Sequence, residues 1–233
     1  PSGSGKTTVA YEVGKFLELR GYKYRVISLD IFLKLKAWRG AIEKIVVADP
    51  DDPLTGADRK LVGESAAIVE PDTTYYDEED FWNQEALRDL LGEIEEFRRS
   101  GKESRVFTVA DAYIRGGTPE RQELNFEINK GDIVIIDGKY ALRDELQGFY
   151  DLRYRLNDNP DRTKAKFEMR TRKLSPNSAD RQMAFYEKGM VPSFERYAVR
   201  TEGAVDYRIE IAGEHEDWKL ISREEPREES SSP

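Results

Sequence analysis

The stretch that decides the fold opens the chain: Pro1-Ser2-Gly3-Ser4-Gly5-Lys6-Thr7-Thr8. It matches the phosphate-binding P-loop pattern G-x-x-x-x-G-K-[ST] from the second position of that pattern onward. In such a loop, backbone N–H groups surround the β-phosphate of a nucleotide, and the lysine ammonium reaches the β and γ oxygens. The hydroxyl after the lysine can ligate Mg²⁺ at the start of a helix whose dipole favours anions. The stretch therefore predicts a nucleoside triphosphate site formed by Ser2, Gly3, Ser4, Gly5, Lys6, Thr7 and Thr8.

The pattern also predicts what stands in front of this loop. Its opening glycine would fall immediately before Pro1, and a P-loop follows a strand. We therefore expect that glycine and a buried central strand to precede Pro1, outside the given sequence.

The composition restricts the class of protein. With 233 residues, of which 38% are hydrophobic, we expect one domain over residues 1–222 and a disordered Glu- and Ser-rich tail over residues 223–233. No apolar run is long enough to span a bilayer and no signal-peptide pattern is present, so we expect a cytoplasmic protein that does not bind membranes. The absence of cysteine excludes disulfides and thiolate zinc sites, and a formal charge of −9 argues against a general nucleic-acid-binding surface.

Helix and strand signals alternate along the chain, as they do in α/β proteins. The expected elements are a helix from the P-loop to Gly21, a strand over 24–29, a helix over 84–99, a β-hairpin over about 104–128, and strands over 133–136, 152–156 and 205–211. Residues 36–74 have weak periodicity, and we interpret them as an insertion beside the site. The pattern indicates a three-layer α/β/α P-loop fold with a mostly parallel sheet, a small hairpin and a helical lid.

Two aspartates close predicted strands. The run Asp132-Ile133-Val134-Ile135-Ile136-Asp137-Gly138 has the consecutive β-branched residues of a parallel strand covered on both faces. Asp137 then stands where a Walker-B-type carboxylate holds Mg²⁺, although it could also cap the following turn. Asp30 ends the strand after the P-loop helix, at the edge of the sheet where open α/β folds bind ligands. It could accept a proton from a substrate hydroxyl, or it could be an ordinary aspartate of a βα turn.

A basic segment follows the strand over 152–156. It contains Arg162, Lys164, Lys166, Arg170, Arg172 and Lys173. Such a run is commonly a solvated helix face. The functional interpretation is a lid over about residues 162–182 whose cations neutralise charge on a transferring phosphoryl group.

Four motifs occur in a characteristic order: the P-loop, then Ser28-Leu29-Asp30-Ile31-Phe32, then Tyr76-Asp77-Glu78 with Phe81, then Asp137-Gly138-Lys139-Tyr140-Ala141-Leu142. Over about residues 1–200 this order resembles the phosphoribulokinase/uridine kinase family of P-loop kinases. The resemblance implies that Asp30 is the catalytic base, that Thr7 and Asp137 bind the metal, and that Asp77 grips sugar hydroxyls. It also aligns Arg170 with a lid arginine.

The chain departs from the family where uridine kinases contact the base. Their P-x-Y-D-x-x-x-H segment corresponds to Thr108-Val109-Ala110-Asp111-Ala112-Tyr113-Ile114-Arg115, which has alanine at the first aromatic position and arginine in place of histidine. We therefore name Tyr113 and Arg115 as further candidate substrate-binding residues. Arg115 could bind a phosphate or carboxylate of the acceptor, or it could be an exposed hairpin arginine. In the lid, Phe167 replaces the family's earlier arginine, and Arg172 and Arg181 are alternative cations.

Two other functions have to be weighed. Asn129-Lys130-Gly131-Asp132 matches the guanine-reading pattern N-K-x-D, but it precedes the Walker-B strand, so we interpret it as a turn rather than as part of a GTPase. A non-catalytic regulatory nucleotide-binding domain is the second alternative. The joint presence of Lys6, Thr7, Asp30 and Asp137 argues against it.

The sequence therefore predicts a kinase with ATP and Mg²⁺ as cofactors that phosphorylates a hydroxyl of a small molecule. The catalytic candidates are Asp30, Lys6 and Arg170. The resemblance favours a nucleoside such as uridine or cytidine as the acceptor, with a sugar or sugar phosphate as the alternative. Members of the family often associate, so the resemblance is compatible with a homo-oligomer, although the sequence alone does not decide between a monomer and an oligomer.

Overall fold

The computed structural model describes residues 5–34, 36–47, 55–62, 82–114, 117, 119, 121–212 and 217–222. Its helices are α1 (Lys6–Leu19), α2 (Lys36–Val47), α3 (Gly56–Val62), α5 (Gln84–Ser100), α6 (Pro160–Leu174), α7 (Ala179–Phe185) and α8 (Val191–Arg200). Its strands are β1 (Tyr24–Ser28), β2 (Ser104–Tyr113), β3 (Arg121–Asn129), β4 (Ile133–Asp137), β5 (Tyr154–Asn157), β6 (Tyr207–Ala212) and β7 (Asp217–Ser222). Short helical turns include η1 (Leu29–Phe32), η3 (Asp144–Phe149), η4 (Pro176–Ser178) and η6 (Glu202–Ala204), and η5 (Tyr186–Met190) is a π-helix.

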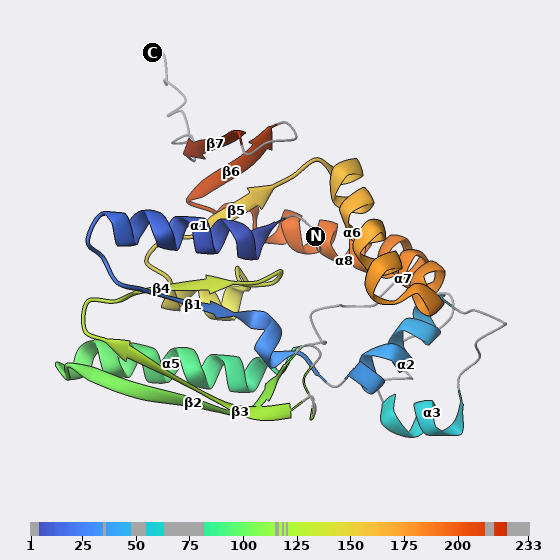
Figure 1. Ribbon diagram of the computed structural model, residues 1–233, viewed down its shortest axis with the longest axis horizontal. Coiled ribbons are helices and arrows are strands. Elements are labelled where there is room, and N and C mark those ends of the chain that lie inside the picture. The colour runs from blue at the N-terminus through green and yellow to red at the C-terminus, as the bar shows by residue number, and fades with distance from the viewer. Residues whose placement is uncertain are drawn as a thin grey trace, which may run out of the picture.

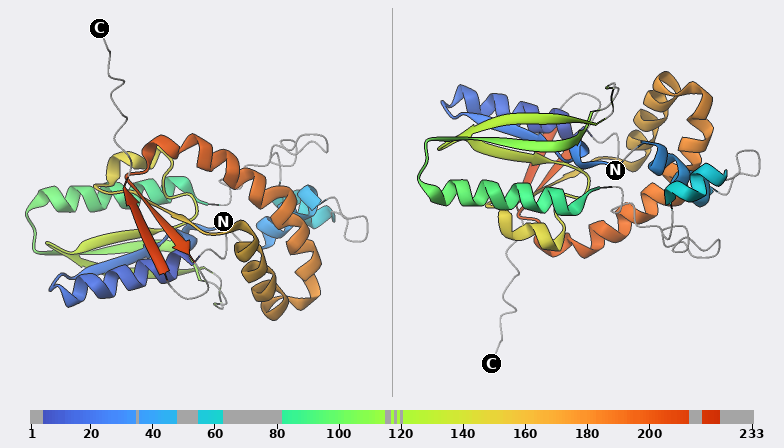
Figure 2. Two further views of the ribbon diagram at one scale, coloured as in Figure 1. Left: turned by 90° about the horizontal axis from the view of Figure 1, so that it is seen from above. Right: turned by 90° about the horizontal axis from the view of Figure 1, so that it is seen from below.

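Parallel pairing organises the strands that carry the site. β1 and β4 run parallel, with a register from Tyr24↔Ile133 to Ser28↔Asp137. β5 and β6 are also parallel, β7 is antiparallel to β6, and β2 and β3 form an antiparallel hairpin. α1 packs against β1 and β4, and α5 lies on the other side of these strands (Figures 1 and 2). The parallel strands between helices agree with the predicted α/β/α architecture.

The amphipathic helix predicted over 84–99 is present as α5. Asn83 begins it, because the side chain of Asn83 accepts a hydrogen bond from the amide of Ala86 at 3.2 Å. Gly101 ends it in the left-handed conformation, with φ of 71°. The face toward the core buries Leu87, Leu90, Leu91, Ile94 and Phe97. Helical spacing of these residues therefore predicted the burial correctly.

A cavity of about 1020 Å³ separates β4 from β5. It extends from Lys6 and Asp137 along apolar side chains of both flanking layers, among them Val9, Val13, Leu91, Ile94, Ile135 and Tyr197. β4 pairs with β1 and β5 pairs with β6, and no other described strand pairs with the edges that face this cavity.

The stretch interpreted as an insertion contains two helices, α2 and α3, within the described residues 36–47 and 55–62. α2 buries Ala41, Ile42 and Val47 in the main core and packs against α7. Figures 1 and 2 show α2, α3, α6 and α7 gathered at the end of the molecule where α1 begins. The described α2 is therefore a packed part of the fold beside the P-loop end of the strands.

The remaining boundaries differ modestly from expectation. β5 begins at Tyr154 and β6 at Tyr207, each two residues later than predicted, and β2 extends to Tyr113. β7 was not predicted, and the tail over 223–233 lies outside the described residues. Within the part of the chain that the structure describes, no helix is both long and apolar enough to cross a membrane.

Candidate active site

The described end of the P-loop is the start of α1. Gly5 has φ of 80°, a left-handed conformation that favours glycine, and its carbonyl accepts the first helical hydrogen bond from Val9 N at 2.9 Å. Lys6 and Thr7 therefore occupy the first turn, where unpaired amides and the helix dipole favour an anion. Ser2, Gly3 and Ser4 lie outside the described residues, so their predicted part in nucleotide binding stays a prediction.

Asp137 meets Thr7 across the fold. The Thr7 hydroxyl donates a hydrogen bond of 2.5 Å to Asp137 Oδ2, and Asp137 is only 6% exposed. Burial raises the pKa of the Asp137 carboxyl above its ordinary value, and the negative charge of Asp30 raises it further. The Thr7 hydrogen bond and the positive charge of Lys6 act in the opposite direction. A cation bound here would stabilise the ionised carboxylate, which is what a metal-binding role requires.

The donor atoms fit Mg²⁺. A hydroxyl and a carboxylate are both oxygen ligands, and Mg²⁺ is commonly held by one or two carboxylates together with water and substrate phosphates. Within the described ranges, no group of three or more His, Cys, Asp or Glu residues could hold a metal by itself. Thr7 and Asp137 are therefore suited to a metal that arrives with a nucleotide.

Asp30 lies beside this pair because of the strand register. Ser28 is the partner of Asp137 at the end of the parallel pair, and Asp30 follows two residues later in η1. The Ser28 hydroxyl accepts a hydrogen bond from Asp30 N at 3.3 Å and so begins that turn. Buried Leu29 and Phe32 anchor the turn, whereas Asp30 is half-buried. The structure thus brings Lys6, Thr7, Asp30 and Asp137 together.

Gly138 permits the close approach of η1 to β4. A Cβ atom at Gly138 would lie 2.5 Å from both Cγ and Cδ1 of Leu29, which is 2% exposed. Glycine is therefore required at position 138 by the packing of Leu29. The Asp137-Gly138 pair is visible in the sequence, but the sequence alone did not predict this contact.

Tyr113 was a candidate substrate-binding residue, and its strand, β2, packs against η1. Tyr113 ends β2, is 7% exposed, and has the guanidinium groups of Arg39 and Arg121 over its ring, at 4.8 and 6.0 Å from the centroid. Sequence reasoning missed both arginines. Arg39 stands in the segment of weak periodicity, and Arg121 carries no motif. Asp77 and Arg115 lie outside the described residues.

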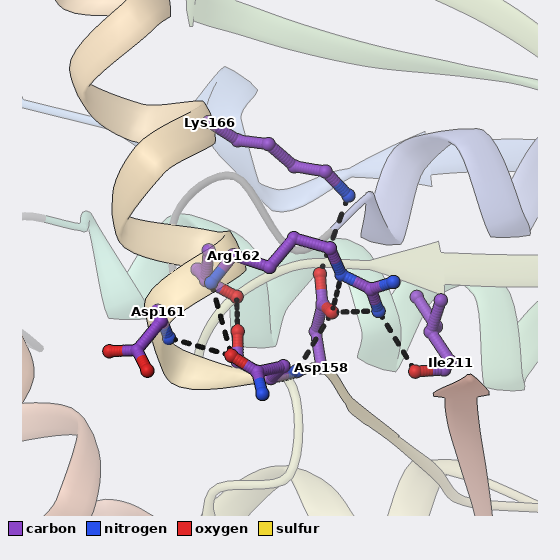
Figure 3. A network of polar contacts seen from close by, with 7 residues as sticks. Asp158, Asp161, Arg162, Lys166 and Ile211 are labelled. Carbon is purple, nitrogen blue, oxygen red and sulfur yellow. Dashed lines mark hydrogen bonds and ion pairs between the residues drawn. The ribbon is translucent and has the colours of Figure 1, made fainter. Parts of the chain in front are cut away.

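The basic helix α6 is held at its base by a buried carboxylate (Figure 3). The Asp158 side chain is 0% exposed, accepts a hydrogen bond of 2.6 Å from Arg162 Nε, and lies 3.5 Å from Lys166 Nζ. Arg162 Nη2 also donates to the carbonyl of Ile211 at 2.8 Å, which ties α6 to β6. Arg162 and Lys166 therefore bind a buried carboxylate at the base of α6, rather than forming only a solvated helix face.

The other cations of α6 differ in their surroundings. Lys164 pairs with Glu187 at 2.6 Å, and Arg172 pairs with Glu168 at 2.9 Å. Phe167 is buried and stacks on Tyr186 with ring centroids 4.6 Å apart. The half-buried Arg170 lies 5.7 Å over the Phe167 ring. Its role at a transferring phosphoryl group stays a prediction.

The segment that matches N-K-x-D is a turn between β3 and β4. Both the backbone amide and the side-chain amide of Asn129 donate to Asp132 Oδ2, at 2.9 and 3.1 Å, and Gly131 has φ of 87°. The turn stands at the start of β4, whereas Asp137 stands at its end. This placement agrees with the interpretation as a turn.

Comparison with known proteins supports the fold. No protein-family model and no curated protein sequence matches the chain. Phosphoribulokinase from Rhodobacter spheroides has a TM-score of 0.52 at 16% identity, covering 90% of this chain and 67% of that one. A possible uridine kinase from Bacillus stearothermophilus has a TM-score of 0.45 at 14% identity, covering 85% and 77%. The likeness to phosphoribulokinase confirms the P-loop kinase fold and, at the level of the fold, the resemblance found in the sequence.

Proposed function

We propose that this protein is an ATP-dependent kinase that transfers the γ-phosphoryl group to a hydroxyl of a small molecule. The observation that carries the proposal is the meeting of Thr7 with the buried carboxylate of Asp137, with Lys6 and Asp30 close enough to affect its pKa. A helix N-terminus with a purely structural role would require neither a lysine in its first turn nor two aspartates beside it at the ends of parallel strands. The kinase fold supports the same class of chemistry.

Each residue has a task that its position supports. The amides at the start of α1 and the Lys6 ammonium hold the phosphates. Thr7 and Asp137 would hold Mg²⁺, which supplies positive charge against the β- and γ-phosphate oxygens. Arg170 would add positive charge from α6 as the phosphoryl group moves.

Asp30 acts on the acceptor. It orients the acceptor hydroxyl and takes its proton as the acceptor oxygen bonds to the γ-phosphorus. The bond from the γ-phosphorus to the β–γ bridging oxygen breaks, and ADP leaves with that oxygen.

The identity of the acceptor is inferred from less direct observations than the kinase activity is. The sequence resemblance favours a nucleoside such as uridine or cytidine, and a sugar or sugar phosphate is the second candidate. Asp77 and Arg115 would contact this acceptor, together with Tyr113. The altered base-contacting segment and the two arginines over Tyr113 favour an acceptor other than a plain pyrimidine nucleoside.

The test is release of ADP from Mg·ATP across nucleosides, pentoses, sugar phosphates and polyols. Replacing Asp30 with asparagine should leave ATP binding intact and reduce acceptor-dependent turnover by about 100-fold or more, the contribution of a positioned base. Asp89→Asn is the matched control, since Asp89 is exposed on α5. Turnover of Asp30→Asn near the wild-type rate would exclude Asp30 as the base. ATP binding without turnover on any acceptor would favour a regulatory nucleotide-binding domain.

A further inference from the structure

A buried lysine follows Asp137 closely along the chain. Lys139 stands two residues beyond the end of β4 and is 9% exposed. Its ammonium lies 5.3 Å from the centroid of the Tyr140 ring and 5.9 Å from that of the Phe194 ring, and aromatic faces stabilise cations. Burial of a charge still costs free energy that an apolar side chain of similar length would not lose. Packing alone therefore does not explain a lysine at this position.

The Lys139 ammonium reaches the junction between the lid and α8. Nζ donates a long hydrogen bond of 3.5 Å to the carbonyl of Met190, the last residue of the π-helix η5. Because α7, η5 and α8 follow one another without a break, η5 joins the lid helices to α8. Pro192 in the first turn of α8 has no N–H to continue a regular helical ladder, and the wider π-helix precedes it. Such π-helical turns occur frequently at functional sites.

Two further contacts fix α8 to the segment after β4. The hydroxyls of Tyr140 and Ser193 lie 3.2 Å apart, and the amide of Leu142 donates to the Tyr197 hydroxyl at 2.7 Å. Both contacts are buried. Met190, Ser193 and Tyr197 have the i, i+3, i+7 spacing of one helical face. This face is therefore bonded to the end of β4 along its length, and the contact of Lys139 is the one nearest the lid.

The other end of η5 carries the contacts to α6. Tyr186, the first residue of η5, stacks on Phe167 with ring centroids 4.6 Å apart, and the Arg170 guanidinium lies 5.7 Å over the same Phe167 ring. Glu187, the next residue of η5, pairs with Lys164 of α6 at 2.6 Å. A continuous series of contacts thus runs from the end of β4 through η5 to Arg170.

We propose that Lys139 is a positioning residue, which holds η5 against the end of β4 and thereby sets where Arg170 stands relative to the nucleotide site. This inference rests on the proposed kinase function and adds a supporting residue to its site. The pairing of β1 with β4 ends at Asp137 and does not involve Lys139. Loss of the ammonium should therefore leave the groups that bind phosphate and Mg²⁺ in place, but it should misalign Arg170 with the transferring phosphoryl group.

The experiment compares Lys139→Met with the wild type in the ADP-release assay. Methionine has a similar length without the charge, so the melting temperature should be unchanged or raised. Because a misplacement of about 1 Å can cost about 100-fold in rate, kcat should fall by about 10-fold or more, while the KM for Mg·ATP changes by less than about 2-fold. Lys139→Arg keeps the cation and should give an intermediate kcat.

Lys188→Met is the matched control. Lys188 is an exposed residue of the same π-helix, and its ammonium also donates to a carbonyl, that of Val47 at 3.1 Å, but this contact leads to α2 and not to β4. Its kcat should equal that of the wild type. An equal loss of kcat in Lys188→Met would show that the contact with β4 has no special part, and would overturn the assignment to Lys139.

A double-mutant cycle with Arg170→Gln tests the route of the effect. If Lys139 acts through Arg170, adding Lys139→Met to Arg170→Gln should lower kcat no further. A loss in the double variant equal to the product of the two single losses would overturn the inference, as would a wild-type kcat in Lys139→Met. A lower melting temperature with an unchanged kcat of the folded enzyme would also overturn it, because Lys139 would then serve stability alone. If Lys139→Met does not fold, Lys139→Arg takes its place in the cycle.

A second measurement separates this inference from the kinase proposal. If no compound stimulates ADP release, hydrogen exchange of the amides over residues 179–190 is measured with Mg²⁺ and a non-hydrolysable ATP analogue. Faster exchange in Lys139→Met than in the wild type, with Lys188→Met unchanged, would preserve the role of Lys139 in holding η5 although the kinase proposal had failed. Equal exchange in all three proteins, or the same increase in both variants, would overturn that role as well.

Discussion

Replacing Gly138 with alanine tests whether the position of Asp30 depends on the contact between β4 and η1. The added Cβ would stand 2.5 Å from Cγ and Cδ1 of Leu29 and 2.6 Å from its Cβ. Real Cβ contacts of this kind are not made below 3.0 Å, so Leu29 has to move by at least half an ångström. Because Leu29 is 2% exposed, the move disturbs packed neighbours rather than solvent.

The expected cost has two parts. Overpacking of a core costs about 1–3 kcal/mol of stability, and Leu29 sits at the upper end of that range because three of its atoms are contacted. Asp30 is bonded to Leu29, so it moves with it. A misplacement of about 1 Å at a reacting group can cost about 100-fold in rate, and the smaller shift here should cost about 10-fold or more in kcat.

The assay combines thermal unfolding with acceptor-dependent ADP release. Gly92→Ala is the control, since Gly92 lies within α5 and a Cβ there would contact nothing within 4 Å. Alanine at this helix position should raise stability by about 1 kcal/mol and leave kcat unchanged. If Gly138→Ala keeps both wild-type stability and wild-type kcat, the contact with Leu29 does not position Asp30, and the reasoning is wrong.

Three further predictions concern the same region and its supports. Thr7→Val removes the hydroxyl that Asp137 accepts from, so kcat should fall and the Mg²⁺ concentration for half-maximal rate should rise, as a Mg²⁺ titration would show. Without Mg²⁺, the raised pKa means that ionised Asp137 costs stability. The stability of the wild type should therefore decline relative to that of Asp137→Asn as the pH rises from the ordinary aspartate pKa through the raised pKa of Asp137. A difference in melting temperature between the two proteins that stays constant over this pH range would contradict the prediction. Asp158→Asn leaves Arg162 without its buried partner and should cost about 3 kcal/mol in denaturant unfolding, whereas Lys166→Met, at a side chain 44% exposed, should cost less than about 1 kcal/mol.

Local patterns in the sequence predicted the parts of this protein that depend on neighbours in the chain. The helical spacing of Leu87, Leu91 and Ile94 gave α5, and four β-branched residues gave the strand that ends in Asp137. The P-loop pattern placed Lys6 and Thr7 at a helix start, where they are found. In each case the deciding energy is local: backbone preference, one buried face, or a cap.

The features that the sequence did not predict depend on contacts between segments that are distant along the chain. Arg39 and Arg121 both lie over the Tyr113 ring, although one comes from α2 and the other from the hairpin. Neither residue belongs to a sequence motif that predicts this contact. The sequence did not predict α2 and α3. The apolar residues of α2 are buried by α7 and the main core, and these are contacts with segments distant along the chain.

The register of β1 and β4 brings the candidate catalytic groups together. The pairing of Ser28 with Asp137 sets the ends of two parallel strands level, so that Asp30 in the following turn and Asp137 itself reach the same edge. A slip by one residue would turn every side chain of β4 to the opposite face, and Asp137 would lose Thr7. The core resists that slip, because Ile27 and Leu29 are nearly fully buried in the present register. Hydrophobic burial in β1 and η1 therefore fixes the relative position of two carboxylates whose charges repel each other.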